Sequence, residues 1–158
     1  MFGLAGVYAS ARLYLVPGRP AWNSPFTVAE FLLTAVLLGS AGANILNNAS
    51  SFTRSATLVS GLATLLAAGS KLLWLERSSV HELRGAFRLL TTVLSGLLSW
   101  RILALVTGLF LLQFAHTRGT AIPVAIALIA GEFIGRYLFF VSVVPTNMAT
   151  GYLAAEAA

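Results

Sequence analysis

Long apolar runs separated by short polar segments dominate this sequence. As α-helices, at about 1.5 Å per residue, most of these runs approach or exceed the roughly 30 Å hydrocarbon core of a bilayer. The first run would reach only about 24 Å, and we interpret it as a helix whose beginning is missing. The pattern predicts an all-α, polytopic membrane bundle of about five transmembrane helices in a single domain, 1–158. The runs lie at 1–16, 27–46, 56–75, 97–113 and 121–144.

Polar segments between the runs predict where the helices begin and end. The proline-rich segment 17–25 breaks the first helix. Thr27 followed by Glu30 matches a capping box at the start of the second helix, whose end is marked by Asn44, Asn47 and Asn48. The remaining connections are predicted as a polar loop at 50–55, an exposed loop with a short surface helix at 76–88, a tight turn at 116–119, and a stop at Pro145.

The composition supports a membrane protein and argues against several other classes. Hydrophobic residues make up 58% of the chain and charged residues 9%, with a mean hydropathy of +0.85. Soluble domains carry about 25% charged residues. The net charge of +5 comes mostly from arginines between the apolar runs. We therefore attribute the basic character to loops and helix ends in contact with the lipid bilayer, and we expect no nucleic-acid partner.

Cofactor ligands are scarce in this sequence. There is no cysteine, so iron–sulfur ligation and covalent c-type haem attachment are excluded. Both histidines, His81 and His116, fall outside the apolar runs. We therefore expect no haem, no metal site and no directly bound cofactor.

Small residues recur at four-residue spacing inside two of the runs. This spacing lets helix backbones approach closely in lipid, so a packing role is the stronger interpretation. The candidate packing residues are Gly39, Ala43, Ala127, Gly131 and Gly135.

Charged residues inside the runs fall on one side of the predicted bundle. Helices joined by short loops must alternate in direction, and this alternation collects six charged residues in one half of the membrane. The opposite half is expected to hold no charge within its spans. The six residues, which we expect to form a buried polar network or a proton path, are Arg12, Glu30, Lys71, Arg101, Glu132 and Arg136.

Glu132 is the most costly of these, because it falls near the middle of the run 121–144. An ionisable residue at that depth costs roughly 2.5–3.5 kcal/mol on insertion scales, so it needs a partner or a task. Arg136 lies four residues further along, in the arrangement that lets an acid and a base meet on one helix face. Two interpretations stay open: a neutralising pair that binds a neighbouring helix, or a role in handling a substrate or protons.

Three segments of this sequence resemble the membrane anchor subunit family of dimethyl sulfoxide reductase. They match the C-terminal part of that family in order and separation. They are Arg-Leu-Tyr at 12–14 with the segment 20–27, Leu-Ser-Trp-Arg-Ile at 98–102, and Ala-Gly-Glu-Phe-Ile-Gly-Arg at 130–136 with 139–140 and 147–149.

The resemblance implies the C-terminal part of an eight-helix anchor in the bacterial inner membrane. Family members hold a molybdopterin catalytic subunit and an iron–sulfur subunit, and they oxidise menaquinol and pass its electrons to the iron–sulfur subunit. The histidine-containing loop associated with quinol binding belongs to the preceding part of the family, so no residue here inherits that role. We expect the chain to be a fragment that contributes no catalytic residue. Candidates for contact with the iron–sulfur subunit are Arg19, Trp22, Arg77, Arg84 and Arg88.

The sequence leaves open the orientation in the membrane and an alternative function. Arginines gather in the loops on the side of Arg12 and Arg77, which the positive-inside rule makes cytoplasmic, whereas the resemblance implies that this side faces the periplasm. The alternative function is a small multi-helix transporter or channel that uses the charged half as a vestibule. Against it, the sequence shows no internal inverted repeat and no pair of broken helices.

Overall fold

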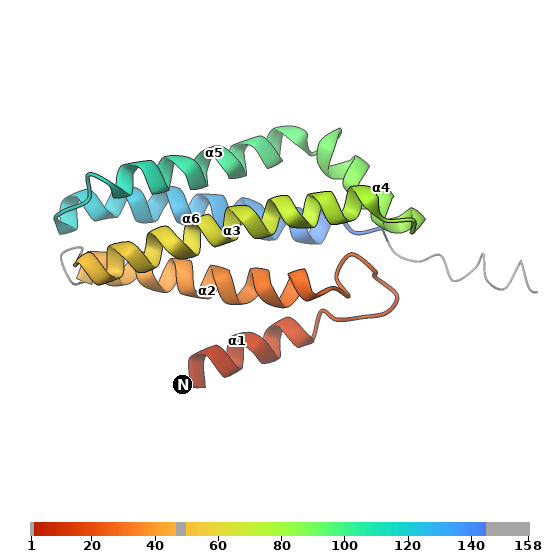
Figure 1. Ribbon diagram of the computed structural model, residues 1–158, viewed down its shortest axis with the longest axis horizontal. Helices are drawn as coiled ribbons and strands as arrows, with labels where there is room; N and C mark the ends of the chain where they lie inside the picture. Colours follow the sequence, from red (N-terminus) through yellow and green to blue (C-terminus); the bar gives the residue numbers. More distant parts are fainter. Residues whose placement is uncertain (1, 47–49, 145–158) are drawn as a thin grey trace, which may run out of the picture.

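The computed structural model describes residues 2–46 and 50–144, and within them every regular element is an α-helix (Figure 1). The positions predicted at Asn47, Asn48, Pro145 and 147–149 lie outside the described residues. The helices are α1 (Phe2–Arg12), α2 (Pro25–Leu46), α3 (Ser51–Arg77), α4 (His81–Thr91), α5 (Ser95–Leu112) and α6 (Arg118–Val141).

Four of these helices, α2, α3, α5 and α6, are long and apolar enough to cross a membrane. The predicted all-α membrane bundle is therefore confirmed. The expected count of about five includes α1, which has 11 residues and spans only about 16 Å. It is too short to cross the bilayer core by itself.

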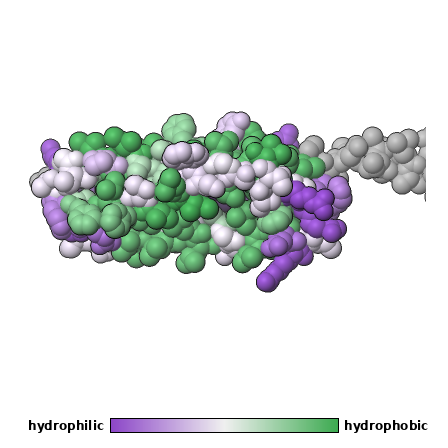
Figure 2. Space-filling model, turned by 90° about the horizontal axis from the view of Figure 1, so that it is seen from above, coloured by the Kyte–Doolittle hydropathy of each residue, from purple (hydrophilic) through white to green (hydrophobic). Residues whose placement is uncertain are grey.

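The four long helices run antiparallel to their chain neighbours (Figure 1). Helix α6 packs between α5 and α2, α2 also packs on α3, and α1 lies along α2. We call the end at which α4 lies the α4 end, and the opposite end, with the α2–α3 and α5–α6 connections, the loop end. Apolar side chains cover most of the visible face between the two ends, and hydrophilic side chains gather at the ends themselves (Figure 2).

Two helix starts differ from the prediction. Helix α2 begins at Pro25, a residue whose fixed φ suits the first turn, so Thr27 lies inside the helix. The Thr27 hydroxyl donates to the carbonyl of Trp22 at 2.6 Å, and the expected capping box with Glu30 is wrong. The segment 50–55 is also not a loop. The Ser50 hydroxyl accepts a hydrogen bond from the Thr53 amide and starts α3 there.

The short surface helix predicted in the segment 76–88 is confirmed as α4. Its apolar face is buried at the α4 end through Leu83, Ala86 and Leu90, while Arg84 and Arg88 are exposed. This helix is amphipathic and covers the end of the bundle between α3 and α5.

The apolar core forms two clusters, one toward each end of the bundle. The cluster toward the loop end includes Leu37, Leu105 and Leu128, and the cluster at the α4 end includes Leu75 and Leu138. Arg101 and Glu132 each fall between the two clusters along their own helix. The charged side chains thus lie at a level of the bundle between two apolar layers.

Candidate functional site

Glu132 lies at the centre of the polar site, on the buried face of α6. It is 4% exposed. Its Oε2 accepts a hydrogen bond from the Thr34 hydroxyl of α2, and its Oε1 lies 4.0 Å from Arg101 Nη2 of α5. One carboxylate therefore connects three helices. The structure brings Arg101 and Glu132 together, as the interpretation of a buried network requires.

The glycines beside Glu132 make room for α5. A Cβ at Gly135 would lie 2.7 Å from both Nε and Cζ of Arg101, and a Cβ at Gly131 would lie 2.9 Å from the Leu105 side chain. Such distances are shorter than carbon contacts normally allow. The two glycines therefore let Arg101 and its helix approach the carboxylate, which explains the spacing of Gly131, Glu132 and Gly135.

Arg136 does not pair with Glu132, so that prediction is wrong. Its guanidinium Cζ lies 3.8 Å from the centroid of the Phe31 ring on α2, a cation–π contact. Glu132 is instead turned toward Thr34 and Arg101. Spacing along one helix permits the pair, but the neighbouring helices offer each side chain a different partner.

A second ion pair lies closer to the α4 end. Lys71 Nζ of α3 lies 2.8 Å from Glu30 Oε2 of α2, and both side chains are largely buried. Lys71 Nζ also lies 5.2 Å from the centroid of the Phe139 ring. The pair joins α2 and α3, whereas Glu132 joins α2, α5 and α6. Arg12 was expected in the same network, but its side chain is exposed at the end of α1, and that expectation is wrong.

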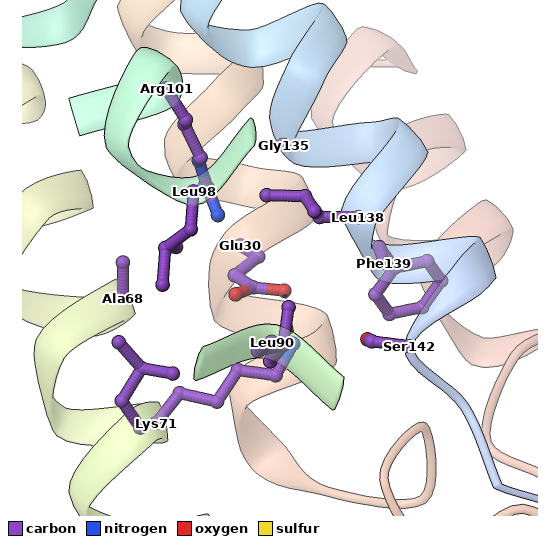
Figure 3. Close-up of a pocket in the computed structure, with 11 residues that line it drawn as sticks. Glu30, Ala68, Lys71, Leu90, Leu98, Arg101, Gly135, Leu138, Phe139 and Ser142 are labelled. Carbon is purple, nitrogen blue, oxygen red and sulfur yellow. Dashed lines mark hydrogen bonds and ion pairs between the residues drawn. The ribbon is translucent and has the colours of Figure 1, made fainter. Parts of the chain in front are cut away.

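Two small cavities lie between these charged groups. One, of about 10 Å³, borders Glu132, Thr34 and Arg136, and the other, of about 30 Å³, borders Lys71 and Ser142. Both are lined by the same four further residues, Glu30, Arg101, Gly135 and Phe139. Figure 3 shows the larger cavity, with Glu30 of α2 between Arg101 of α5 and Lys71 of α3.

Exposed arginines gather at the α4 end. Arg77, Arg84 and Arg88 are exposed, as a docking role would require. Trp22 is not available for docking, because it is 8% exposed, stacks on the Phe139 ring and donates its Nε1–H to the Phe139 carbonyl at 2.9 Å. The Arg19 guanidinium lies 4.3 Å from the Trp22 ring centroid. Trp22 therefore fastens the α1–α2 connection to α6.

The other predicted packing residues are less closely packed than the two glycines of α6. Gly39 is exposed, and a Cβ there would meet no atom within 4 Å, so its predicted packing role is wrong. Ala43 and Ala127 are half-buried. Four-residue spacing alone does not say which face of a helix meets a neighbour.

A neutral polar cluster near the loop end was not predicted from the sequence. Asn44 Nδ2 donates to Thr57 Oγ1 at 2.8 Å, and Thr53 Oγ1 donates to Asn44 Oδ1 at 2.7 Å. Thr57 Oγ1 also donates to Ser40 Oγ at 3.0 Å. The signal was present in the helical spacing of Thr53, Thr57, Ser60 and Thr64, which share one buried face of α3.

The two arginines at the loop end bind the ends of helices. Arg54 Nη2 donates to the carbonyls of Leu112 and Gln113 at the end of α5, and Arg118 Nη2 donates to the carbonyl of Leu46 at the end of α2. Arg54 lies in the first turn of α3, so the opposite half of the membrane is not free of charge as expected. Its charge satisfies carbonyl groups that have no partner within their own helix.

Comparison with known proteins gives one match. Residues 1–141 match the family model described as the DMSO reductase anchor subunit (DmsC). No curated protein and no solved structure matches the chain. Within residues 2–46 and 50–144, no three His, Cys, Asp or Glu side chains gather as a metal site would require.

Proposed function

We propose that this chain, which belongs to the family of DMSO reductase anchor subunits, holds a molybdopterin catalytic subunit and an iron–sulfur subunit at the bacterial inner membrane. Membership in the family implies association with a DMSO reductase complex. In the proposal, electrons from a quinol such as menaquinol reach the iron–sulfur subunit through this complex. No residue of this chain is proposed to be catalytic.

The observation that carries the proposal is the family match over residues 1–141, on a chain with four helices able to span a membrane. The apolar face in Figure 2 is a surface that lipid could contact. A bundle of this kind can hold soluble subunits at a membrane without itself touching the terminal electron acceptor.

The α4 end is the proposed contact surface for the iron–sulfur subunit. Arg77, Arg84 and Arg88 are exposed there, and the described residues of that surface offer fewer acidic groups, Glu76 and Glu82. Complementary charge on a partner would guide association and fix its orientation. The arginines of the loop end already donate to helix carbonyls, which leaves the α4 end as the more available basic surface.

The buried ion pairs are proposed to keep this surface in shape. Glu132 with Arg101 joins α5 and α6, and Glu30 with Lys71 joins α2 and α3. The hydrogen bond from Thr34 to Glu132 links the two pairs of helices. Buried pairs add little net stability compared with apolar replacements, but losing one partner is costly. They therefore favour one arrangement of the helices, which a docking surface built on helix ends requires.

Co-purification tests the proposal. The tagged chain is extracted from native membranes in mild detergent, and the co-eluting subunits are identified together with their iron and molybdenum content. We expect an iron–sulfur protein and a molybdenum protein to elute with the chain. Arg88→Gln should weaken this association more than Gln113→Glu, which lowers the charge by the same amount at the loop end. Solute flux through liposomes containing only this chain, without metal-containing partners, would instead support the transporter alternative.

A further inference from the structure

The hydroxyl of Thr34 lies between two acceptors. Thr34 Oγ1 is within hydrogen-bonding distance of the Glu30 carbonyl oxygen, at 2.7 Å, and of Glu132 Oε2. A hydroxyl carries one proton and can donate it only once, whereas a carbonyl oxygen can only accept. When Thr34 donates to Glu30, Glu132 satisfies the second contact by donating its own carboxyl proton. When Glu132 is ionised, Thr34 donates to the carboxylate instead.

This geometry accommodates both protonation states of Glu132 without moving a heavy atom. Rotation of one hydroxyl hydrogen is enough to exchange the two arrangements. A buried carboxylate needs a donor, because an unpaired charge in low dielectric is costly. Thr34 is a donor that can turn away.

Two polar atoms beside Thr34 have no hydrogen-bond partner among the described residues. They are Glu132 Oε1 and Arg101 Nε, both on buried side chains. The distance of 4.0 Å between Glu132 Oε1 and Arg101 Nη2 is too long for a direct hydrogen bond. Buried polar atoms in proteins are nearly always paired, often with ordered water.

The two cavities provide the space for water. A cavity of about 10–15 Å³ holds one water molecule, so the cavity beside Glu132 suits one molecule and the larger one suits two or three. Both border Glu30 and Arg101. The larger one reaches Lys71 on α3 and Ser142 just beyond the end of α6, toward the α4 end (Figure 3). At the loop end, the closely packed residues around Leu105 and Leu128 separate Glu132 from that side.

We propose that the two cavities hold a short chain of water molecules through which Glu132 exchanges protons with the aqueous phase at the α4 end. In each exchange a hydronium ion gives one proton to the Glu132 carboxylate and becomes water, and the reverse step returns the proton. No electron moves. Thr34 is a positioning residue that follows the protonation state by turning its hydroxyl.

The charges that face Glu132 come from every neighbouring helix. Arg101 of α5 is the closest cation, and Arg136 borders the same cavity from α6. Glu30 of α2 lines that cavity too and is paired with Lys71 of α3. The proposal depends on these contacts and not on the anchor role, so either can fail without the other.

Solid-state NMR of the chain in lipid bilayers tests the proposal. The chain contains only five glutamates, so side-chain carboxyl labelling with ¹³C gives few signals, and Glu132→Gln identifies that of Glu132. We expect magnetisation from water to reach the Glu132 carboxyl rapidly and its signal to shift as the pH is changed. The carboxamide of Asn44 is equally buried, and its nitrogen and its oxygen each have a hydrogen-bond partner, so it is the reference and should receive water magnetisation slowly.

Two leucine substitutions on α3 test the route. Ala68 lines the larger cavity, whereas Ser70 is exposed on the same helix. Ala68→Leu should abolish rapid water transfer to Glu132, and Ser70→Leu should preserve it. The proposal is overturned if the Glu132 signal of the unmodified chain receives water no faster than Asn44, if it does not shift with pH, or if Ala68→Leu leaves the transfer unchanged.

Discussion

The two halves of this bundle bury polar groups in different ways. Near the loop end, neutral side chains of α2 and α3 donate and accept among themselves: Asn44, Thr53, Thr57 and Ser40 form a connected cluster. Toward the α4 end, charged side chains from all four long helices meet beside two cavities, and Glu132 Oε1 and Arg101 Nε have no hydrogen-bond partner among the described residues.

The difference indicates two roles for buried polar groups in this bundle: the neutral cluster holds helices together, and the charged cluster can interact with protons and partners. In the neutral cluster the side chains of α2 and α3 bond to one another and hold the two helices together. A charged cluster with unpaired atoms and room for water costs more to bury and is more responsive to protons and partners. The exposed arginines of α4 lie at the same end as the charged cluster, which places the proposed docking surface and the proposed proton route together.

The largest loss of stability is expected when Glu132, the acidic partner of Arg101, is replaced. Glu132→Leu should lower the free energy of unfolding by about 3–5 kcal/mol, because the buried guanidinium cannot give up its proton. Arg101→Leu should cost less, because the remaining carboxyl can take up a proton. Reversible unfolding in mixed micelles measures both. Equal losses for the two variants would contradict the proposed freedom of Glu132 to be protonated.

The close approach of α5 and α6 can be tested with a single methyl group. Gly135→Ala places a Cβ 2.7 Å from the Arg101 guanidinium and should cost about 1–3 kcal/mol as Arg101 is displaced. Gly39→Ala is the matched control, since its Cβ meets no atom within 4 Å, and the better helix propensity of alanine should leave stability unchanged or slightly improved. The same unfolding measurement compares them. A Gly135→Ala variant as stable as Gly39→Ala would show that the helices do not need this glycine.

A substitution in the neutral cluster should lower the free energy of unfolding by less. Thr57→Val removes the hydroxyl that bonds Asn44 and Ser40, and hydrogen bonds between membrane helices contribute on average about 0.6 kcal/mol each. We expect a loss of about 1 kcal/mol. Thr107→Val makes the same change at an exposed position of α5 and should have no measurable effect. If both variants unfold alike, the cluster does not hold α2 to α3.

The smallest loss of stability is expected for Arg54, the arginine that donates to carbonyl groups at the end of α5. Arg54→Gln removes donors to the Leu112 and Gln113 carbonyls and should cost roughly 0.3–1 kcal/mol. Arg77→Gln, at an exposed position at the end of α3, is the comparison. Amide hydrogen exchange at the end of α5 reads out the effect locally. Exchange there should accelerate in Arg54→Gln and stay unchanged in Arg77→Gln.

Much of the fold could be predicted from the sequence, because apolar runs and their lengths are set by the bilayer. The grouping of Glu30 with Lys71 and of Arg101 with Glu132 in one half also followed from chain direction. The same reasoning was wrong for Arg12, which is exposed, and for the opposite half, where α3 carries Arg54. The side chain with which each charged residue pairs could not be predicted in the same way. The spacing of Glu132 and Arg136 is a local property of α6, whereas the choice between Arg136 and Arg101 depends on which helix lies alongside. Gly39 and Gly135 both belong to a four-residue series of small residues, and packing against α5 distinguishes Gly135 from Gly39.

The predicted helix boundaries were wrong where polar side chains form hydrogen bonds with the backbone at a helix end. The serines and threonines of 50–55 resembled a loop, but the Ser50 hydroxyl caps α3 and lets the helix begin there. Trp22 was predicted to contact the iron–sulfur subunit and is instead stacked on Phe139, more than a hundred residues away in the chain. Contacts at such separation leave no pattern in the local sequence.

Site-specific cross-linking tests the central claim, that this chain holds an iron–sulfur subunit at its α4 end. Because the chain has no cysteine, His81→Cys on α4 and Gln113→Cys at the loop end each introduce a single thiol at an exposed position. Cross-linking in native membranes from such a thiol to its nearest protein neighbour is read by mass spectrometry. We predict an adduct with an iron–sulfur protein from His81→Cys and none from Gln113→Cys. An iron–sulfur adduct formed only from Gln113→Cys, or from neither variant, would contradict the claim.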